Sequence, residues 1–322
     1  MSDPVTPPEA GELLRALAHL AEPPGPAHPT LAEALGLPAP PDAATHTDLF
    51  GFQLYPYASV YLGSEGMIGG EAEERISGFW RAVGREVPPE PDHLASLMGL
   101  YAALGEEEAE LAAEPGAEAR VTLVARSRRA LLEEHLAPWV FAFLERIEEL
   151  GGTFHARWAE MLRGCLLHEL ARGGAIASRP VHLEVAPPLP DPRDEGAAPF
   201  MTALLAPVRS GVILTRADLA RIARALELGL RAGERRYALK HLMGQAAPDV
   251  LAALAEEAER QADLHAARSA PIGAPASFLE ARARGTAELL RTLAGAARAS
   301  ELAESDGTAG ETTPATLESR GS

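Results

Sequence analysis

Apolar residues recur at spacings of three and four along almost the whole chain, which is the period of an α-helix with one buried face. No segment alternates strictly between apolar and polar residues and ends in a hairpin turn, so nothing favours a β-strand. The pattern therefore predicts an all-α fold. A helix from about residue 71 would align Ile76, Phe79 and Val83, and the next helix would run from Asp92 to a break at Gly105.

Helix starts are indicated where a Thr or Ser precedes an acid by three residues, since the two side chains can then satisfy each other's backbone amides. This form occurs at Thr6–Glu9, Thr30–Glu33, Thr215–Asp218 and Ser277–Glu280.

A proline-rich segment divides the chain. Six prolines fall between Arg179 and Pro199, and because proline cannot continue a helix, we expect an extended tether here. The predicted units are a helical bundle domain over residues 1–175, a Pro-rich linker over 176–199, a smaller helical extension over 200–304 and a disordered tail over 305–322.

The charge is distributed unevenly. The 322 residues carry a net charge of −17, which disfavours nucleic acid as a main partner because phosphates are repelled. Residues 1–175 hold 12 basic and 27 acidic groups, whereas residues 176–322 hold 17 and 19. The acidic field therefore belongs to the N-terminal domain.

A basic segment stands out within the extension. Residues 201–250 carry eight basic residues against four acids. This segment has three interpretations: it binds an anionic cofactor, it binds a client protein, or it docks on the acidic N-terminal domain, and docking is favoured. The basic residues are Arg209, Arg216, Arg221, Arg224, Arg231, Arg235, Arg236 and Lys240.

The compartment in which we expect the protein follows from the features that its sequence lacks. The N-terminus lacks the features of an export signal, and the longest uncharged stretch is broken by Pro56 and glycines, so we expect neither export nor membrane insertion. The single cysteine, Cys165, excludes an internal disulfide and a cysteine-based metal site. Cytoplasm is the expected compartment.

Catalytic motifs are missing. The sequence has no Walker loop, no dinucleotide-binding glycine motif, no nucleophile elbow and no His-Glu-x-x-His pair, so we expect no enzyme activity, no cofactor and no metal. The glycine-rich loop from Gly63 to Gly70 is interpreted as a turn rather than an anion cradle. Histidines at 19, 28, 46, 182 and 265 are interpreted as surface or linker residues.

Two local features have more than one interpretation. Asp92-His93 follows Pro91 and is explained either as a helix cap with a packed imidazole or as a functional pair facing a groove. The adjacent Phe79 and Trp80 cannot both face one helix stripe, so one of them lines a groove or a second contact.

Four motifs follow one another in a fixed order along the chain: Pro56–Leu62, Glu65–Glu71, Glu90–Leu94 and His135–Trp139. In this order they resemble the TorD/DmsD/NarJ family of redox-enzyme maturation chaperones. The resemblance covers roughly residues 10 to 172. It implies an all-helical chaperone that binds the twin-arginine signal peptide and the apo form of a molybdopterin oxidoreductase, assists cofactor insertion and delays export. Its implied partners are that catalytic subunit and the proteins that deliver the molybdopterin cofactor.

The resemblance also implies where the signal peptide binds. Asp92 and His93 carry over first, with the rest of their loop, and four aromatic residues follow because they lie near the motifs. The implied signal-peptide site is Glu90, Pro91, Asp92, His93, Tyr57, Tyr61, Trp80 and Trp139. Many relatives place Glu-Leu-x-Phe-Met after the loop, where this chain has Ser96–Leu100, so the peptide specificity stays open.

Two alternatives remain at the level of sequence. One is a helical scaffold for respiratory-complex assembly that does not bind a signal peptide. The other is a metal-binding or enzymatic helical protein that uses Asp92, His93 and His135.

Overall fold

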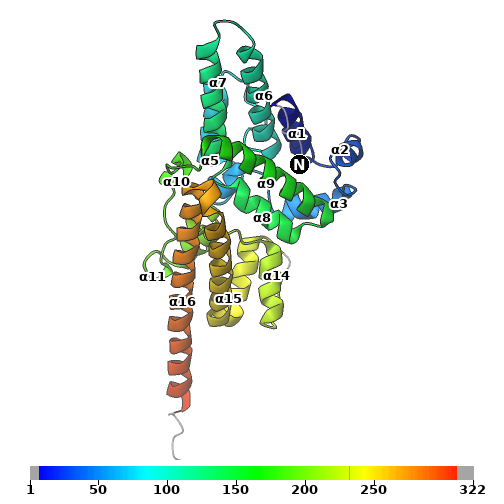
Figure 1. Cartoon of the computed structure of the whole chain (residues 1–322). Coiled ribbons are helices and arrows are strands. Elements are labelled where there is room, and N and C mark those ends of the chain that lie inside the picture. Colours follow the sequence, from blue (N-terminus) through cyan, green and yellow to red (C-terminus); the bar gives the residue numbers. More distant parts are fainter. Residues whose placement is uncertain (1–6, 232, 310–322) are drawn as a thin grey trace, which may run out of the picture.

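The computed structural model describes residues 7–231 and 233–309, and within them it contains α-helices, two short π-helical segments and no β-sheet (Figure 1). The all-α prediction is confirmed. The first half of the chain forms the upper part of Figure 1, where α6 and α7 make a projecting hairpin, and the second half forms the lower part.

The N-terminal part comprises α1 (Pro7–His19), α2 (His28–Ala34), α3 (Ala43–Thr47), η1 (Asp48–Gln53), α4 (Ala58–Leu62), α5 (Gly70–Ala82), α6 (Leu94–Ala112), α7 (Glu118–Ala130), η2 (Leu131–Leu136), α8 (Val140–Leu150) and α9 (Thr153–Gly173). The remainder comprises α10 (Val181–Glu184), α11 (Pro192–Glu195), α12 (Ala197–Leu204), α13 (Pro207–Ser210), α14 (Arg216–Ala225), α15 (Arg235–Ile272) and α16 (Ala274–Ala309).

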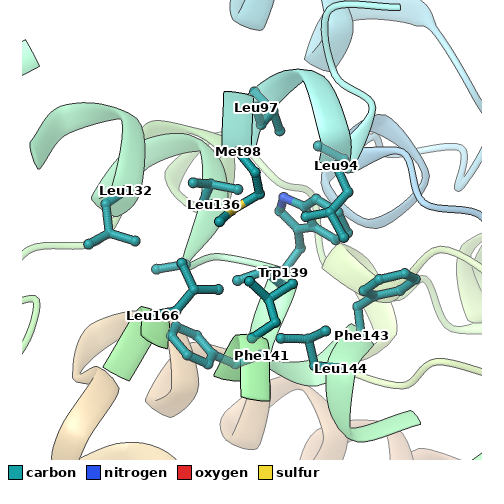
Figure 2. Close-up of a cluster of buried hydrophobic side chains, with 14 of the residues drawn as sticks. Leu94, Leu97, Met98, Leu132, Leu136, Trp139, Phe141, Phe143, Leu144 and Leu166 are labelled. Carbon is teal, nitrogen blue, oxygen red and sulfur yellow. The ribbon is translucent and has the colours of Figure 1, made fainter. Parts of the chain in front are cut away.

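Large apolar side chains from α6, η2, α8 and α9 fill the core of the N-terminal part (Figure 2). Two buried tryptophans anchor it, and each has its indole N–H satisfied: Trp139 Nε1 donates to the His135 carbonyl at 2.8 Å, and Trp158 Nε1 donates to the Leu17 carbonyl at 2.9 Å. A buried indole needs such an acceptor, because an unpaired N–H away from water costs free energy.

Several helix boundaries differ from the prediction. The helix α2 begins at His28, with a proline in its first turn, rather than at Thr30. Ser277 lies inside α16, which begins directly after Gly273. The helix α6 runs through Gly105 to Ala112, since its apolar face packs on α1 and outweighs the low helix propensity of glycine.

One predicted start is confirmed in detail. Thr215 Oγ1 accepts from the amide of Asp218 at 3.2 Å, and Asp218 Oδ2 accepts from the amide of Thr215 at 2.9 Å, which is a complete capping box on α14. Thr6, the start of another predicted box, lies outside the described residues.

The segment 176–199 is a packed connector rather than an extended tether. It contains two short helices, and Leu183 is 1% exposed. The amide of Ile176 donates to the carbonyl of Ile272 at 3.0 Å, and Arg282 donates to the carbonyl of Ala186 at 2.9 Å. The prolines stop long helices, but the apolar residues between them still bury surface against the rest of the molecule.

The extension is built around the antiparallel pair α15 and α16, with α12 and α14 packed against it. It has an apolar cluster of its own, which includes Leu219, Leu242, Leu254 and Leu290. Other extension residues, such as Phe278, belong instead to the core of the N-terminal part. The two parts therefore share packing and are not separated by an open linker.

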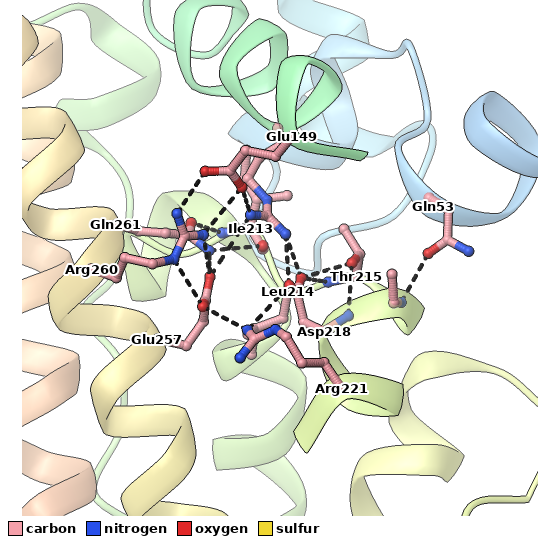
Figure 3. Close-up of polar contacts among 12 residues, drawn as sticks. Gln53, Glu149, Ile213, Leu214, Thr215, Asp218, Arg221, Glu257, Arg260 and Gln261 are labelled. Atoms are coloured by element: carbon pink, nitrogen blue, oxygen red, sulfur yellow. Dashed lines mark hydrogen bonds and ion pairs between the residues drawn. The ribbon is translucent and has the colours of Figure 1, made fainter. Parts of the chain in front are cut away.

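Polar contacts, one of them a buried ion pair, join the two parts (Figure 3). Arg146 of α8 pairs with both carboxylate oxygens of Asp218 in α14, at 2.7 and 2.6 Å. Arg260 of α15 reaches Glu149 at 2.6 Å, and the amide of Ala217 donates to Gln53 at 3.0 Å.

The docking interpretation of the basic segment 201–250 is therefore wrong for most of its residues. Only Arg216 contacts a side chain of the N-terminal part, the ring of Phe52 at 5.2 Å, in the contacts found among the described residues. The ion pairs that cross the interface use Arg146, Arg260 and Arg268 instead. Arg224, Arg231, Arg236 and Lys240 are exposed.

Two further expectations changed. Of the histidines interpreted as surface or linker residues, His28, His46, His182 and His265 are buried. The helix α16 continues to Ala309, past the predicted start of the tail at residue 305, and residues 310–322 lie outside the described part. No helix within the described ranges is long and apolar enough to cross a membrane.

Candidate functional site

The short helix α4 brings together the motifs that are separate in the sequence. Asp92 Oδ2 accepts from the amide of Ser59 at 2.9 Å, and the carbonyl of Asp92 accepts from the amide of Ala58 at 2.9 Å. Asp92 is 1% exposed. It therefore caps α4 and not its own helix, since a carboxylate at a helix start satisfies amides that have no partner within the helix.

Ser59 extends this connection to the glycine-rich loop. Its hydroxyl oxygen accepts from the amide of Gly69 at 3.0 Å, while its own amide is held by Asp92. One buried serine thus fixes the loop before α6 and the loop before α5 to each other.

His93 caps α6. Its Nδ1 accepts from the amide of Ala95 at 3.1 Å, so in the neutral ring Nε2 carries the proton and can donate. Burial lowers the pKa of His93, although the charge of nearby Glu90 acts in the opposite direction. The edge of the ring meets Tyr57, with the ring centres 4.9 Å apart.

The outer part of the loop is oriented by two aromatic residues. The hydroxyl of Tyr57 donates to the exposed carboxylate of Glu90 at 2.7 Å, and Trp80 Nε1 donates to the carbonyl of Pro91 at 3.1 Å. Burial and the bond to Glu90 both raise the pKa of Tyr57, which keeps its hydroxyl protonated. Trp80 supports the loop, and Phe79 turns the other way, onto the ring of His135.

Tyr61 and Trp139 lie in the core. Their rings stack with centres 5.1 Å apart, and they are 4% and 1% exposed. The Tyr61 hydroxyl donates to the carbonyl of Tyr55 at 2.9 Å. Neither ring has a surface that a bound peptide could contact. The expected direct contact of these two residues with the signal peptide is therefore wrong for this structure, and both rings pack in the core beside α4.

A pocket of about 520 Å³ opens beside these residues. We call it the acidic pocket. Three of the residues that the resemblance implies, Tyr57, Glu90 and His93, line it. Its lining residues are Ala21, Glu22, Pro23, His46, Thr47, Phe50, Gly51, Tyr55, Pro56, Tyr57, Glu90, His93 and Ser96.

Sequence reasoning missed Glu22, His46, Phe50 and Tyr55. Glu22 lies beyond α1, where no motif marks it. His46 of α3 lies 3.4 Å from the carbonyl of Ala21, the residue before Glu22, and both residues line the pocket together with Glu90.

The acidic pocket is suited to a cation with a flat, weakly hydrated head group. The carboxylates of Glu22 and Glu90 line it, and its lining includes no Lys or Arg. His46 adds no charge at neutral pH because burial lowers its pKa. Aromatic walls and carboxylates together favour a guanidinium, which pairs with two oxygens at once and stacks on rings.

The metal alternative receives no support from the arrangement of side chains. The Asp92 carboxylate already accepts a hydrogen bond from the Ser59 amide. His135 faces His182, with His135 Nδ1 and His182 Nε2 3.1 Å apart. In the described part of the chain, no three His, Cys, Asp or Glu side chains gather as a metal ion would need.

A comparison with family models matches residues 17–145 to the family described as nitrate reductase delta subunit. All residues that line the acidic pocket fall within the matched segment, and α9, the connector and the extension follow it. Searches of curated proteins and of solved structures give no match.

Proposed function

We propose that this chain is a chaperone that binds the twin-arginine leader of an apo-molybdoenzyme, because residues 17–145 match the model of the nitrate reductase delta subunit family, whose members act in molybdoenzyme maturation. It holds the catalytic subunit until the molybdopterin cofactor is inserted, and it delays export until then. The chain acts by binding and performs no chemistry.

The observation that carries the proposal is the acidic pocket. Glu22 and Glu90 offer two carboxylates beside aromatic walls, and the lining residues include no competing cation. An arginine side chain satisfies both features, since its guanidinium pairs with carboxylates and stacks on rings. The Tyr57 hydroxyl holds the Glu90 side chain in place, so Glu90 loses less conformational entropy when the peptide binds.

The charge distribution supports the same role. Residues 1–175 carry a net charge of −15, so a basic leader is attracted to the part of the chain that contains the pocket. Such steering raises the association rate and weakens as salt is added.

Calorimetry tests the site with a synthetic peptide that carries Arg-Arg before an apolar stretch of about ten residues, within the usual range for export leaders. We expect the double variant Glu22→Gln/Glu90→Gln to bind it at least ten-fold more weakly, while Glu86→Gln, an exposed acid outside the acidic pocket, binds like the parent chain. Equal affinity of the double variant and the parent chain would refute the assignment.

A second experiment separates leader binding from scaffolding. We expect the client subunit to co-purify with the chain only when its leader is present. Capture of a leaderless client by the chain, at a yield equal to that of the full client, would favour the scaffold function instead.

A further inference from the structure

A second pocket, of about 360 Å³ and named here the loop pocket, lies between the glycine-rich loop and the connector. The loop joins α4 to α5, and the connector contributes the residues in and after α10. The lining residues are Leu62, Gly63, Ser64, Glu65, Met67, Ile68, Gly69, Gly70, Glu71, Ala72, Arg75, His182, Val185, Ala186 and Pro187.

Exposed apolar side chains gather at this pocket. Eight large apolar or aromatic side chains are exposed among the described residues, and four of them are here. Met67, Ile68 and Val185 line the pocket and are 65%, 54% and 53% exposed, and Val181 lies one turn before Val185. Exposed apolar side chains that cluster, rather than scatter, mark a binding surface.

A buried imidazole without its full set of partners lies in the wall of the loop pocket. His182 is fully buried, and its Nε2 is engaged by His135 Nδ1 at 3.1 Å. Its Nδ1 has no hydrogen-bond partner. An unpaired buried nitrogen costs free energy, and His182 lies behind the wall of the pocket with no side-chain surface exposed to a ligand.

The net charge of the pocket argues against a small anion as the occupant. Arg75 is paired with Glu71, and Glu65 adds a further negative charge. The exposed side chains of Met67, Ile68 and Val185 fit an apolar peptide segment better, and the flexible side chain of Met67 adapts to different side chains.

The two pockets lie at opposite ends of one short helix. Tyr57, directly before α4, lines the acidic pocket, and Leu62, the last residue of α4, lines the loop pocket. Five residues of helix span about 8 Å. Ser59 fixes the two loops to each other through Asp92 and Gly69, so the spacing of the pockets is rigid.

We propose that the loop pocket binds the apolar stretch that follows the arginine pair of the leader. This inference rests on the proposed function and assigns each half of the leader to its own pocket. Val185, Ala186 and Pro187 come from the connector, which lies outside the residues that match the family model.

Calorimetry with three synthetic peptides tests the assignment: an Arg-Arg leader with its apolar stretch, the same leader with that stretch replaced by serines, and the leader with Gln-Gln in place of Arg-Arg. Met67→Ser/Ile68→Ser should bind the full leader at least ten-fold more weakly and should bind the serine peptide as the parent chain does. Leu123→Ser, at an exposed apolar position on α7 that is outside both pockets, is the matched control.

The outcomes separate the two proposals. If the parent chain binds the full leader and the Gln-Gln leader equally weakly, the proposed function fails. If Glu22→Gln/Glu90→Gln weakens binding and Met67→Ser/Ile68→Ser does not, only the loop pocket assignment is overturned. An equal loss for both double variants on the serine peptide also overturns it, because the loop pocket would then act without the apolar stretch.

Discussion

Asp92 and Ser59 are 33 residues apart in the chain, yet a hydrogen bond of 2.9 Å between the Asp92 carboxylate and the Ser59 amide joins their two segments in the candidate site. Ser59 in turn accepts from Gly69, which joins the loop of Glu90 to the glycine-rich loop. The aspartate of the Pro-Asp-His motif therefore positions the site from inside the protein, and the exposed Glu90 presents charge to a ligand.

The role of Asp92 predicts a difference between two substitutions. Asp92→Ala removes the cap of α4 and should lower the free energy of unfolding by about 1–2 kcal/mol and weaken leader binding. Asp92→Asn keeps an acceptor oxygen for Ser59 and should bind the leader within about three-fold of the parent chain. Urea denaturation and calorimetry check the pair. Equal weakening by both variants would show instead that the Asp92 charge contacts the leader.

Features that a few neighbouring residues specify were predicted correctly from the sequence, whereas features that depend on tertiary packing were not. The capping box of Thr215 and Asp218 is contained in four residues, so the sequence specifies it. Asp92 looked like the cap of its own helix because nothing local indicates that Ser59 is its partner. The stacked Tyr61 and Trp139 belong to recognisable motifs, but burial rather than ligand contact explains them, and only the three-dimensional packing distinguishes the two.

The missed residues follow the same rule. Glu22 enters the acidic pocket through the packing of distant segments, and His182 enters the loop pocket because the connector folds back onto α5. A proline-rich composition predicts where long helices stop. It does not predict whether the apolar residues between the prolines find a surface to bury against.

Removal of Asp218 should destabilise the whole chain, because it would leave Arg146 buried without its main partner. Both side chains are 4% exposed, and losing one member of a buried pair costs about 3–5 kcal/mol. We expect Asp218→Ala to lower the free energy of unfolding by about that amount. Asp249→Ala, which breaks an exposed pair with Arg298, should cost less than about 1 kcal/mol. Urea denaturation of both variants makes the comparison, and equal effects would contradict the importance of burial.

Acid should destabilise the fold through its buried histidines. Burial lowers the pKa of His155 to about 4, of His135 to about 4 and of His182 to about 3. Below pH of about 6.5 the unfolded chain binds protons that the folded chain does not, so stability falls with pH, by up to about 1.4 kcal/mol per pH unit for each histidine, until the folded-state pKa is reached.

His155 allows a direct test of this pH dependence. Its Nε2 is buried without a partner, and its ring lies among Phe50, Phe154 and His46. His155→Phe should therefore raise the free energy of unfolding at pH 5 relative to the parent chain and flatten its slope between pH 7 and 5. An unaltered slope in His155→Phe would contradict the assignment.

Gly66 should resist substitution for two reasons that can be separated. Its φ of +64° strains any other residue, and a Cβ there would lie 2.8 Å from the carbonyl oxygen of Leu205 and 2.9 Å from Cα of Ala206, backbone atoms that cannot easily move aside. Gly70 has a similar φ of +76°, but its Cβ would meet nothing within 4 Å.

Both Gly66→Ala and Gly70→Ala should lose about 1–2 kcal/mol of stability because of the left-handed backbone. Only Gly66→Ala also pushes the extension away from the glycine-rich loop, so it should show the larger loss of thermal stability and a larger loss of leader affinity. Thermal melts and calorimetry of the two variants give the comparison. Equal losses would mean that the contact between Gly66 and the extension does not help to hold the loop pocket in shape.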